Sequence, residues 1–202
     1  NANTGGANPP EWTADYKHIL VGSTAGSSRP LIKLASNAPL FDNTSKPRQM
    51  ISFRRFAAVN ANGTTEAEPS DPMELPPNFE DAFGHLFYDE LRGIDFDCTG
   101  HAGCAGIVMD GAQATSVKDV KVNATGALSG IRAMSSQDGL LANIEIVGGQ
   151  YGILLTGLPG AGGAGMGGGV ITGVRLINQT VRAIESPGNN ISTSVVGFEI
   201  IK

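Results

Sequence analysis

Charged and aromatic residues are both scarce in this sequence. Asp, Glu, Lys and Arg make up 16% of the 202 residues and aromatic residues 6%, with a formal net charge of −5. A chain with few basic residues and an acidic balance is not expected to have nucleic acid as its main partner. No apolar run approaches the roughly 20 residues that a membrane-spanning helix requires, so the sequence predicts no membrane span.

Long amphipathic helices are also missing. No stretch keeps a 3.6-residue period over about 12 residues without an interruption by Gly, Pro or β-branched residues. Glycine is abundant instead, with 28 residues, but it does not recur at every third position, which excludes a collagen-like chain. We therefore expect an all-β fold in which short strands are joined by glycine-rich turns.

The chain has only two cysteines, Cys98 and Cys104, and the segment between them is turn-like. This spacing favours a short-loop disulfide, and the alternative is two free thiols, at least one of them buried. A zinc site needs more ligands than these two thiols and the neighbouring His101, so the sequence predicts no metal site.

A repeat of about 24 residues runs through residues 86–202. Five strand-like segments have central apolar residues that lie 26, 24, 30 and 24 residues apart: Ile94, Val120, Ile144, Val174 and Phe198. A second set of segments interleaves with the first and carries Ile107, Ile131, Ile153 and Ile184. Because short strands recur at this period without helices, the pattern predicts a parallel β-helix, a solenoid whose apolar residues stack into one core.

The residues expected to point outward support this register. They are Asp95, Lys121, Glu145, Arg175 and Glu199, and their charges alternate in sign at every step. Opposite charges on neighbouring strands each stabilise a sheet by a few tenths to about 1 kcal/mol. This order favours a solvent-exposed ladder of ion pairs over a catalytic pair of carboxylates.

The composition divides the single predicted domain into four regions. Residues 1–17 are expected to form an extended arm, 18–59 irregular first coils, 60–85 an acidic, proline-rich loop, and 86–202 the regular coils. The strand pattern at the end of the chain lacks a cap. We therefore expect either a longer chain or neighbouring copies, or another chain, that cover the open ends of the solenoid.

A glycine-rich insertion between two of the repeats contains G-x-G-x-x-G at residues 160–165. A dinucleotide site requires a helix to begin there, so that its N-terminus faces the pyrophosphate. The glycines at 167–169 cannot begin one, so the sequence predicts no nucleotide and no other cofactor.

Five Asn-x-Ser/Thr sequons are more than chance alone predicts for this composition. They lie at Asn43, Asn62, Asn123, Asn178 and Asn190. This excess favours an extracellular, secreted protein that carries N-linked glycans.

Three stretches resemble the pectate-lyase-like β-helix superfamily and, within it, the glycoside hydrolase family 55 exo-β-1,3-glucanases. They lie within residues 19–34, 106–120 and 130–153, and the most specific parts are Ala-Gln-Ala-Thr-Ser at 112–116 and Gly-Gly-Gln-Tyr-Gly at 148–152. The resemblance implies a right-handed parallel β-helix, secretion and a polysaccharide partner. The Gly-Ala-x-Gly-Asp-Gly segment that usually opens such chains is missing, and no residue matches the glucanases' catalytic acid, so the resemblance assigns no catalytic residue.

Two functions remain open at this point. The first is a secreted scaffold segment that is structural or associated with a glycan, and the alternative is part of a polysaccharide hydrolase, similar to the β-1,3-glucanases, or of a lyase. An inverting hydrolase needs two carboxylates about 6.5–9.5 Å apart, one of them with a raised pKa. The candidate acids are Asp95, Asp97, Asp110 and Asp119, and the candidate base is Arg132. Two convergent carboxylates in a groove favour the enzyme, whereas a paired ladder favours the scaffold.

Overall fold

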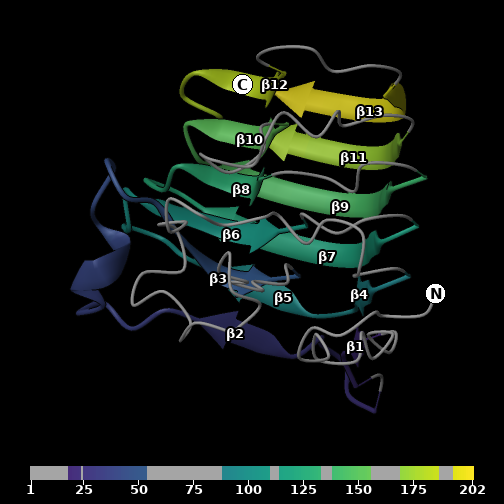
Figure 1. The fold of residues 1–202 in the computed structure, drawn as a ribbon, viewed down its shortest axis with the longest axis horizontal. Helices are drawn as coiled ribbons and strands as arrows, with labels where there is room; N and C mark the ends of the chain where they lie inside the picture. Colours follow the sequence, from purple (N-terminus) through teal and green to yellow (C-terminus); the bar gives the residue numbers. More distant parts are fainter. Residues whose placement is uncertain are drawn as a thin grey trace, which may run out of the picture.

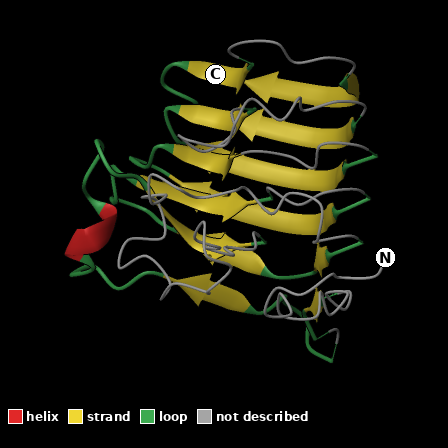
Figure 2. Cartoon of the chain, viewed as in Figure 1, coloured by secondary structure: helices red, strands yellow, loops and turns green. Residues whose placement is uncertain are grey.

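A computed structural model of the chain describes residues 18–23, 25–53, 88–109, 114–132, 138–155, 169–186 and 193–202. The described residues form a parallel β-helix in which successive coils stack from the N-terminal to the C-terminal end (Figure 1). Apart from one short 3-10 helix, η1 (Pro39–Phe41), their regular structure consists of strands (Figure 2). The predicted fold class is therefore confirmed. The predicted arm at 1–17 and the loop at 60–85 lie outside the described residues.

Two parallel sheets form the walls of the solenoid. The long sheet has eight strands: β1 (Ile19–Val21), β2 (Leu31–Lys33), β4 (Glu90–Arg92), β5 (Asp95–Asp97), β7 (Ser116–Ala124), β9 (Leu140–Gly148), β11 (Val170–Ile177) and β13 (Ser194–Ile201). The short sheet has five: β3 (Arg48–Ser52), β6 (Cys104–Val108), β8 (Ser129–Arg132), β10 (Tyr151–Leu154) and β12 (Arg182–Glu185). Each coil contributes to both walls, so residues about 24 positions apart become neighbours.

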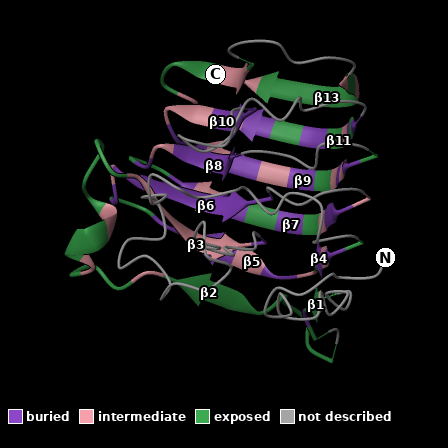
Figure 3. Ribbon diagram, in the orientation of Figure 1, coloured by how far each residue is buried: buried purple, intermediate pink, exposed green. Residues whose placement is uncertain are grey.

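The predicted register is confirmed in both sheets. In the long sheet, Ile144 pairs with Val120 on one side and with Val174 on the other, and Val174 pairs with Phe198. In the short sheet the four isoleucines at 107, 131, 153 and 184 form one continuous column. Most of these residues belong to a single buried core (Figure 3).

A row of glycines in the short sheet allows the two sheets to pack closely together. An added Cβ at Gly130 would lie 2.4 Å from Cγ2 of Ile146 in the long sheet, and one at Gly106 would lie 2.8 Å from Cγ1 of Val122. A Cβ at Gly152 would likewise meet Cδ2 of Leu176 at 3.0 Å. Since real Cβ atoms almost never approach this closely, these glycines allow the side chains of the long sheet to reach the backbone of the short sheet.

The first coils depart from the regular pattern. Residues 91–97, expected to form one strand, form β4 and β5 with a break at Gly93, where φ is 66°. β1 and β2 belong to one coil but are separated by a loop, of which residues 22–23 and 25–30 are described. This loop lies over the long sheet, and it creates the hollow described below.

Candidate functional site

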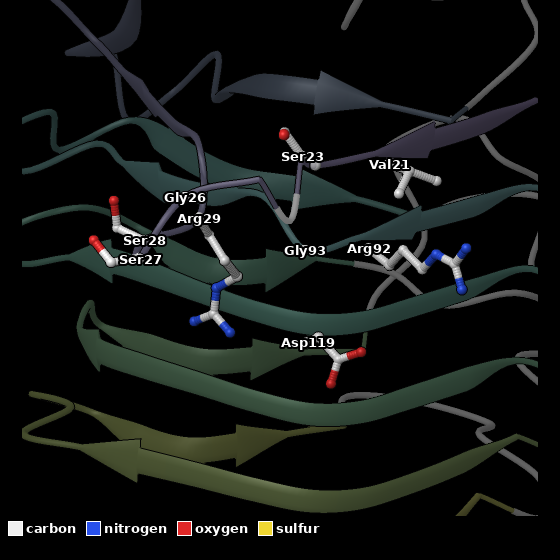
Figure 4. Close-up of a pocket in the computed structure, with 10 residues that line it drawn as sticks. Val21, Ser23, Gly26, Ser27, Ser28, Arg29, Arg92, Gly93 and Asp119 are labelled. Atoms are coloured by element: carbon white, nitrogen blue, oxygen red, sulfur yellow. The ribbon is translucent and has the colours of Figure 1, made fainter.

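The outer face of the long sheet carries a hollow with a volume of about 700 Å³. The loop between β1 and β2 supplies Ser23, Gly26, Ser27, Ser28 and Arg29 to its wall. The strands beneath contribute the remaining charged side chains, Arg92 and Asp119. Figure 4 shows Asp119 on the sheet below this loop, between Arg29 and Arg92 in that view.

A second hollow of about 320 Å³ adjoins the first and shares Arg29 with it. It is lined by residues from β7, β9 and β11, among them Lys121, Asn143, Glu145 and Arg175. Both hollows are lined by Arg29, and their other lining residues come from successive coils, so we refer to the two hollows together as the long-sheet groove. Because strands in a sheet lie about 4.8 Å apart, an elongated ligand along the groove meets a new polar side chain at each coil.

The groove follows a line of residues in left-handed backbone conformation. They are Gly93, Asp119, Asn143, Gly173 and Gly197, with φ between 53° and 66°. Each of them lies one residue before a central apolar residue of the repeat, so the strand changes direction at the same point in every coil. Gly, Asn and Asp are the residues that adopt this conformation at the lowest cost. Their recurrence at the repeat spacing is a sequence signal that our sequence analysis missed.

Asp119 is the described candidate acid for which the structure shows no ion pair. Its Oδ1 accepts a hydrogen bond from Nδ2 of Asn143, one coil further along, at 2.6 Å. The carboxylate lines the larger hollow, where a ligand can reach it. It is a hydrogen-bonding group, and no second carboxylate lines that hollow among the described residues.

The predicted ladder of alternating charges is confirmed. Its basic side chains form ion pairs with the carboxylates beside the groove. Asp95 accepts a hydrogen bond from Nε of Arg29 at 2.8 Å and another from the backbone N–H of Lys121. Glu145 lies 2.7 Å from Nζ of Lys121 and 2.7 Å from Nη1 of Arg175. Arg175 continues the ladder to Glu199, 2.8 Å away.

These contacts stabilise the ionised form of Glu145. The hydrogen bond from Lys121 and the charges of Lys121 and Arg175 lower the pKa of Glu145, although its partial burial opposes them. A general acid needs the opposite shift, because it must keep its proton near neutral pH. Glu145 therefore suits a structural ion pair better than proton donation.

Asp97, the last residue of β5, is held in the same way. Burial raises the pKa of Asp97, but the hydrogen bonds from Lys33 and Thr99 outweigh burial and leave its pKa lowered. The Lys33 ammonium lies 2.8 Å from one carboxylate oxygen, and the Thr99 hydroxyl donates to the other at 2.6 Å. Asp97 lines neither hollow.

The structure does not bring the remaining candidates into the groove. Arg132 belongs to β8 of the short sheet, paired between Val108 and Leu154, and only 7% of its surface is exposed. A base that abstracts a proton from a polysaccharide must contact the sugar, and this degree of burial prevents that contact. Asp110 lies outside the described residues.

The two cysteines are free thiols in the structure, which corrects the expectation of a disulfide. Both are fully buried in the core, and the thiol of Cys104 donates a long hydrogen bond to the carbonyl of Ala105. The pKa of Cys104 is raised, mainly by its hydrogen bond with Cys98 and to a smaller extent by burial.

His101, between the two cysteines, has a structural role. Its Nδ1 lies 2.9 Å from a carboxylate oxygen of Asp42, and its Nε2 lies 3.0 Å from the carbonyl oxygen of Ala35. These contacts hold the segment around η1 against the turn at residues 98–104. In the described part of the chain, no group of three or more His, Cys, Asp or Glu is arranged to hold a metal ion.

The described sequons differ in accessibility. Asn43 and Asn178 are exposed, whereas Asn123 is partly buried and its side-chain oxygen accepts hydrogen bonds from Thr125. Asn62 and Asn190 lie outside the described residues. Glycosylation remains a prediction, and Asn43 and Asn178 are its best-placed sites.

Comparison with known proteins finds no family model, curated protein or solved structure that matches the chain. The fold is consistent with a β-helix superfamily, and no match supports the pectate-lyase-like proteins or the glucanases specifically. No described helix is long and apolar enough to cross a membrane. The groove residues Arg29, Arg92 and Asn143 were not singled out from the sequence as site residues, and the loop that carries Arg29 has no counterpart in the repeat.

Proposed function

We propose that the chain is a secreted, non-catalytic scaffold that binds a polysaccharide in the long-sheet groove. The observation that carries this proposal is the groove itself, which crosses several coils and is lined by polar and charged side chains. An extended polymer is a suitable ligand for a surface whose lining residues come from successive coils. The serines of the loop, Asn143 and the arginines offer hydrogen-bond donors and acceptors of the kind that hydroxyl-rich ligands require.

The absence of a catalytic role is supported by the carboxylates beside the groove. Asp95 and Glu145 each form an ion pair with a basic side chain, and the pKa of Glu145 is lowered rather than raised. Hydrolysis by the usual two-carboxylate mechanism requires one acid that stays protonated. A fold shared with polysaccharide-active enzymes does not itself establish activity.

Binding is tested by isothermal titration of the 202-residue chain with soluble β-1,3-glucan, polygalacturonate and xylan. Arg29→Ala removes the side chain shared by both hollows, and we expect it to weaken binding by about tenfold, the effect of one charged hydrogen bond of roughly 1.5 kcal/mol. Arg182→Ala is the matched control, since Arg182 is an exposed arginine of the short sheet. Failure of all three polysaccharides to bind, or equal losses in both variants, would contradict the proposal.

The alternative, part of a polysaccharide hydrolase or lyase, is favoured by one observation, the accessible Asp119 in the larger hollow. Incubation of the chain with the same polysaccharides, followed by assays for new reducing ends and for unsaturated products, distinguishes the two functions. We expect no product. Release of product that Asp119→Asn abolishes would overturn the scaffold proposal and assign a catalytic role to this carboxylate.

A further inference from the structure

Two of the five positions in the left-handed row carry a side chain, and both belong to the long-sheet groove. Gly93, Gly173 and Gly197 fill three of the positions, whereas Asp119 and Asn143 have φ of 55° and 53°. A residue other than glycine is strained in this conformation, although Asp and Asn tolerate it better than most. Strain of this kind is typical of functional sites, so the two side chains suggest a role that glycine would not fill.

These two side chains bind each other across neighbouring coils. β7 and β9 pair on both sides of the two positions, so Asp119 lies opposite Asn143. Nδ2 of Asn143 donates a hydrogen bond to Oδ1 of Asp119 at 2.6 Å. Both residues are exposed, so without this bond each side chain would rotate in solvent. The hydrogen bond therefore holds the two polar groups in one arrangement.

The pair connects the two hollows of the groove, because Asp119 lines the larger hollow and Asn143 lines the smaller one. The neighbouring positions of the row are Gly93, which also lines the larger hollow, and Gly173, which also lines the smaller one. Since glycine has no side chain, the row leaves the pair uncovered on both sides. A sugar chain that passes from one hollow into the other contacts this pair.

Most of the hydrogen-bonding capacity that the pair retains is that of an acceptor. Within the described residues, the structure gives neither side chain another hydrogen bond. Oδ2 of Asp119 and Oδ1 of Asn143 can each accept one, and Asn143 keeps a single N–H to donate. These acceptors lie on strands about 4.8 Å apart and suit the hydroxyl groups of a sugar chain. An ionised carboxylate or sulfate has no proton to donate, and the charge of Asp119 repels it.

The other charges of the groove do not offset this repulsion. Each described basic side chain that lines the groove belongs to an ion pair. The pairs are Arg29 with Asp95, Arg92 with Glu90, and Lys121 and Arg175 with Glu145. Asp119 is the lining charge for which the described structure shows no ion pair, so it decides which charge a ligand can carry at this point.

We propose that Asp119 and Asn143 determine the specificity of the long-sheet groove, because they bind hydroxyl groups of a polysaccharide and reject sugars that carry a carboxylate or sulfate group. This inference rests on the proposed function, since it assigns the residues and the ligand chemistry of the same groove. Asp119 acts here as a binding residue and takes no part in proton transfer.

Glycine substitutions separate recognition from folding. Asp119→Gly and Asn143→Gly each remove one member of the pair and leave a residue that adopts the left-handed conformation without strain. Asn178→Gly is the matched control, because Asn178 is exposed, has φ of 58° and lines neither hollow. Urea denaturation verifies that each variant is folded. Isothermal titration uses soluble β-1,3-glucan and xylan, each beside its carboxymethylated form, which adds charge to the same backbone.

We expect the wild type to bind the uncharged form of at least one polymer more tightly than its carboxymethylated form. Asp119→Gly should weaken this binding about tenfold and Asn143→Gly by a smaller factor, because hydrogen bonds to charged groups are the stronger ones. Asn178→Gly should leave it unchanged. Asp119→Asn keeps an acceptor and removes the charge, so it should narrow the difference between the two forms.

The outcomes distinguish this inference from the proposed function. A wild-type chain that binds none of these polymers overturns both. Equal affinities of the wild type, Asp119→Gly and Asn143→Gly for a polymer that binds overturn this inference alone, and so does a preference of the wild type for the carboxymethylated forms. A loss in Asn178→Gly as large as in the pair variants also overturns it, because the effect would then belong to the strand backbone.

Discussion

β9 and β13 occupy equivalent places in the long sheet, yet their side chains are buried to very different degrees. Ile146 of β9 and Ile200 of β13 are the same residue type in the same column, and their exposed fractions are 0% and 50%. Within the described residues, β9 has β7 and β11 on its two edges, whereas β13 pairs with β11 alone. The sequence pattern decides which face a side chain occupies, and the neighbouring coils decide how much of that side chain is buried.

The ion pairs show the same dependence on neighbours. Glu145 lies between Lys121 and Arg175, whereas Glu199 has Arg175 as its partner. The Glu199 side chain is 57% exposed, compared with 25% for Glu145. Since water screens exposed pairs, the inner glutamate should contribute more to stability than the terminal one.

The largest expected difference is between two identical core substitutions. Ile146→Ala removes buried methyl and methylene groups and leaves a cavity, so we expect a loss of about 2–5 kcal/mol in the free energy of unfolding. Ile200→Ala removes groups that are already half in water, and about half that loss or less should follow. Urea denaturation at a protein concentration low enough to keep the chain monomeric measures both values. Equal losses for the two variants in the monomer would show that the coils do not differ in packing as their exposures indicate.

A smaller effect is expected from filling the space beside the glycine row. Gly130→Ala forces the added Cβ against Ile146 at 2.4 Å and against the carbonyl of Gly152 at 3.1 Å. Overpacking of this kind typically costs about 1–3 kcal/mol. Gly26→Ala is the control, because its nearest neighbour lies 3.7 Å away, and the change in stability there should be close to zero. A neutral Gly130→Ala, by thermal or urea unfolding, would indicate that the sheets can move apart freely.

The fold could be predicted because the repeat appears twice in the sequence. The apolar column through Val120, Ile144 and Val174 and the charge ladder on the opposite face independently require the same register. A shift by one residue would turn the charges inward. The split between β4 and β5 was missed because the left-handed row that bends each strand is made of different residues, including Gly93 and Asp119.

The candidate site was less predictable than the fold, because it is not formed by the repeat alone. The long-sheet groove depends on the loop at residues 22–30, which occurs once and leaves no periodic signal. Asp95 was a candidate acid and Glu145 a member of the charge ladder, and the roles of both depend on Arg29, Lys121 and Arg175 within hydrogen-bond distance. The pairing of the two cysteines was open for a similar reason, because spacing along the chain does not determine the direction of their side chains.

The smallest predicted difference concerns the two glutamates of the ladder. At neutral pH, Glu145→Gln should cost up to about 1 kcal/mol, and Glu199→Gln only a few tenths. The pKa of Glu145 is lowered from 4.5 by Lys121, and a lowered pKa means that the folded state favours the ionised form. Its contribution to stability is therefore complete above about pH 4.5 and declines as the pH falls through the lower pKa of the folded state.

Urea denaturation of the wild type and the two variants at pH 7 and at pH 3 tests this ordering. The gap between wild type and Glu145→Gln should narrow at pH 3, because protonation removes the same charge that the substitution removes. Added salt should reduce the gap for Glu199→Gln by the larger fraction, since the more exposed pair is screened more strongly. A gap for Glu145→Gln that is unchanged at pH 3 would mean that the side chain stabilises the coil by packing, and that the order of charges along the ladder reflects solubility rather than register.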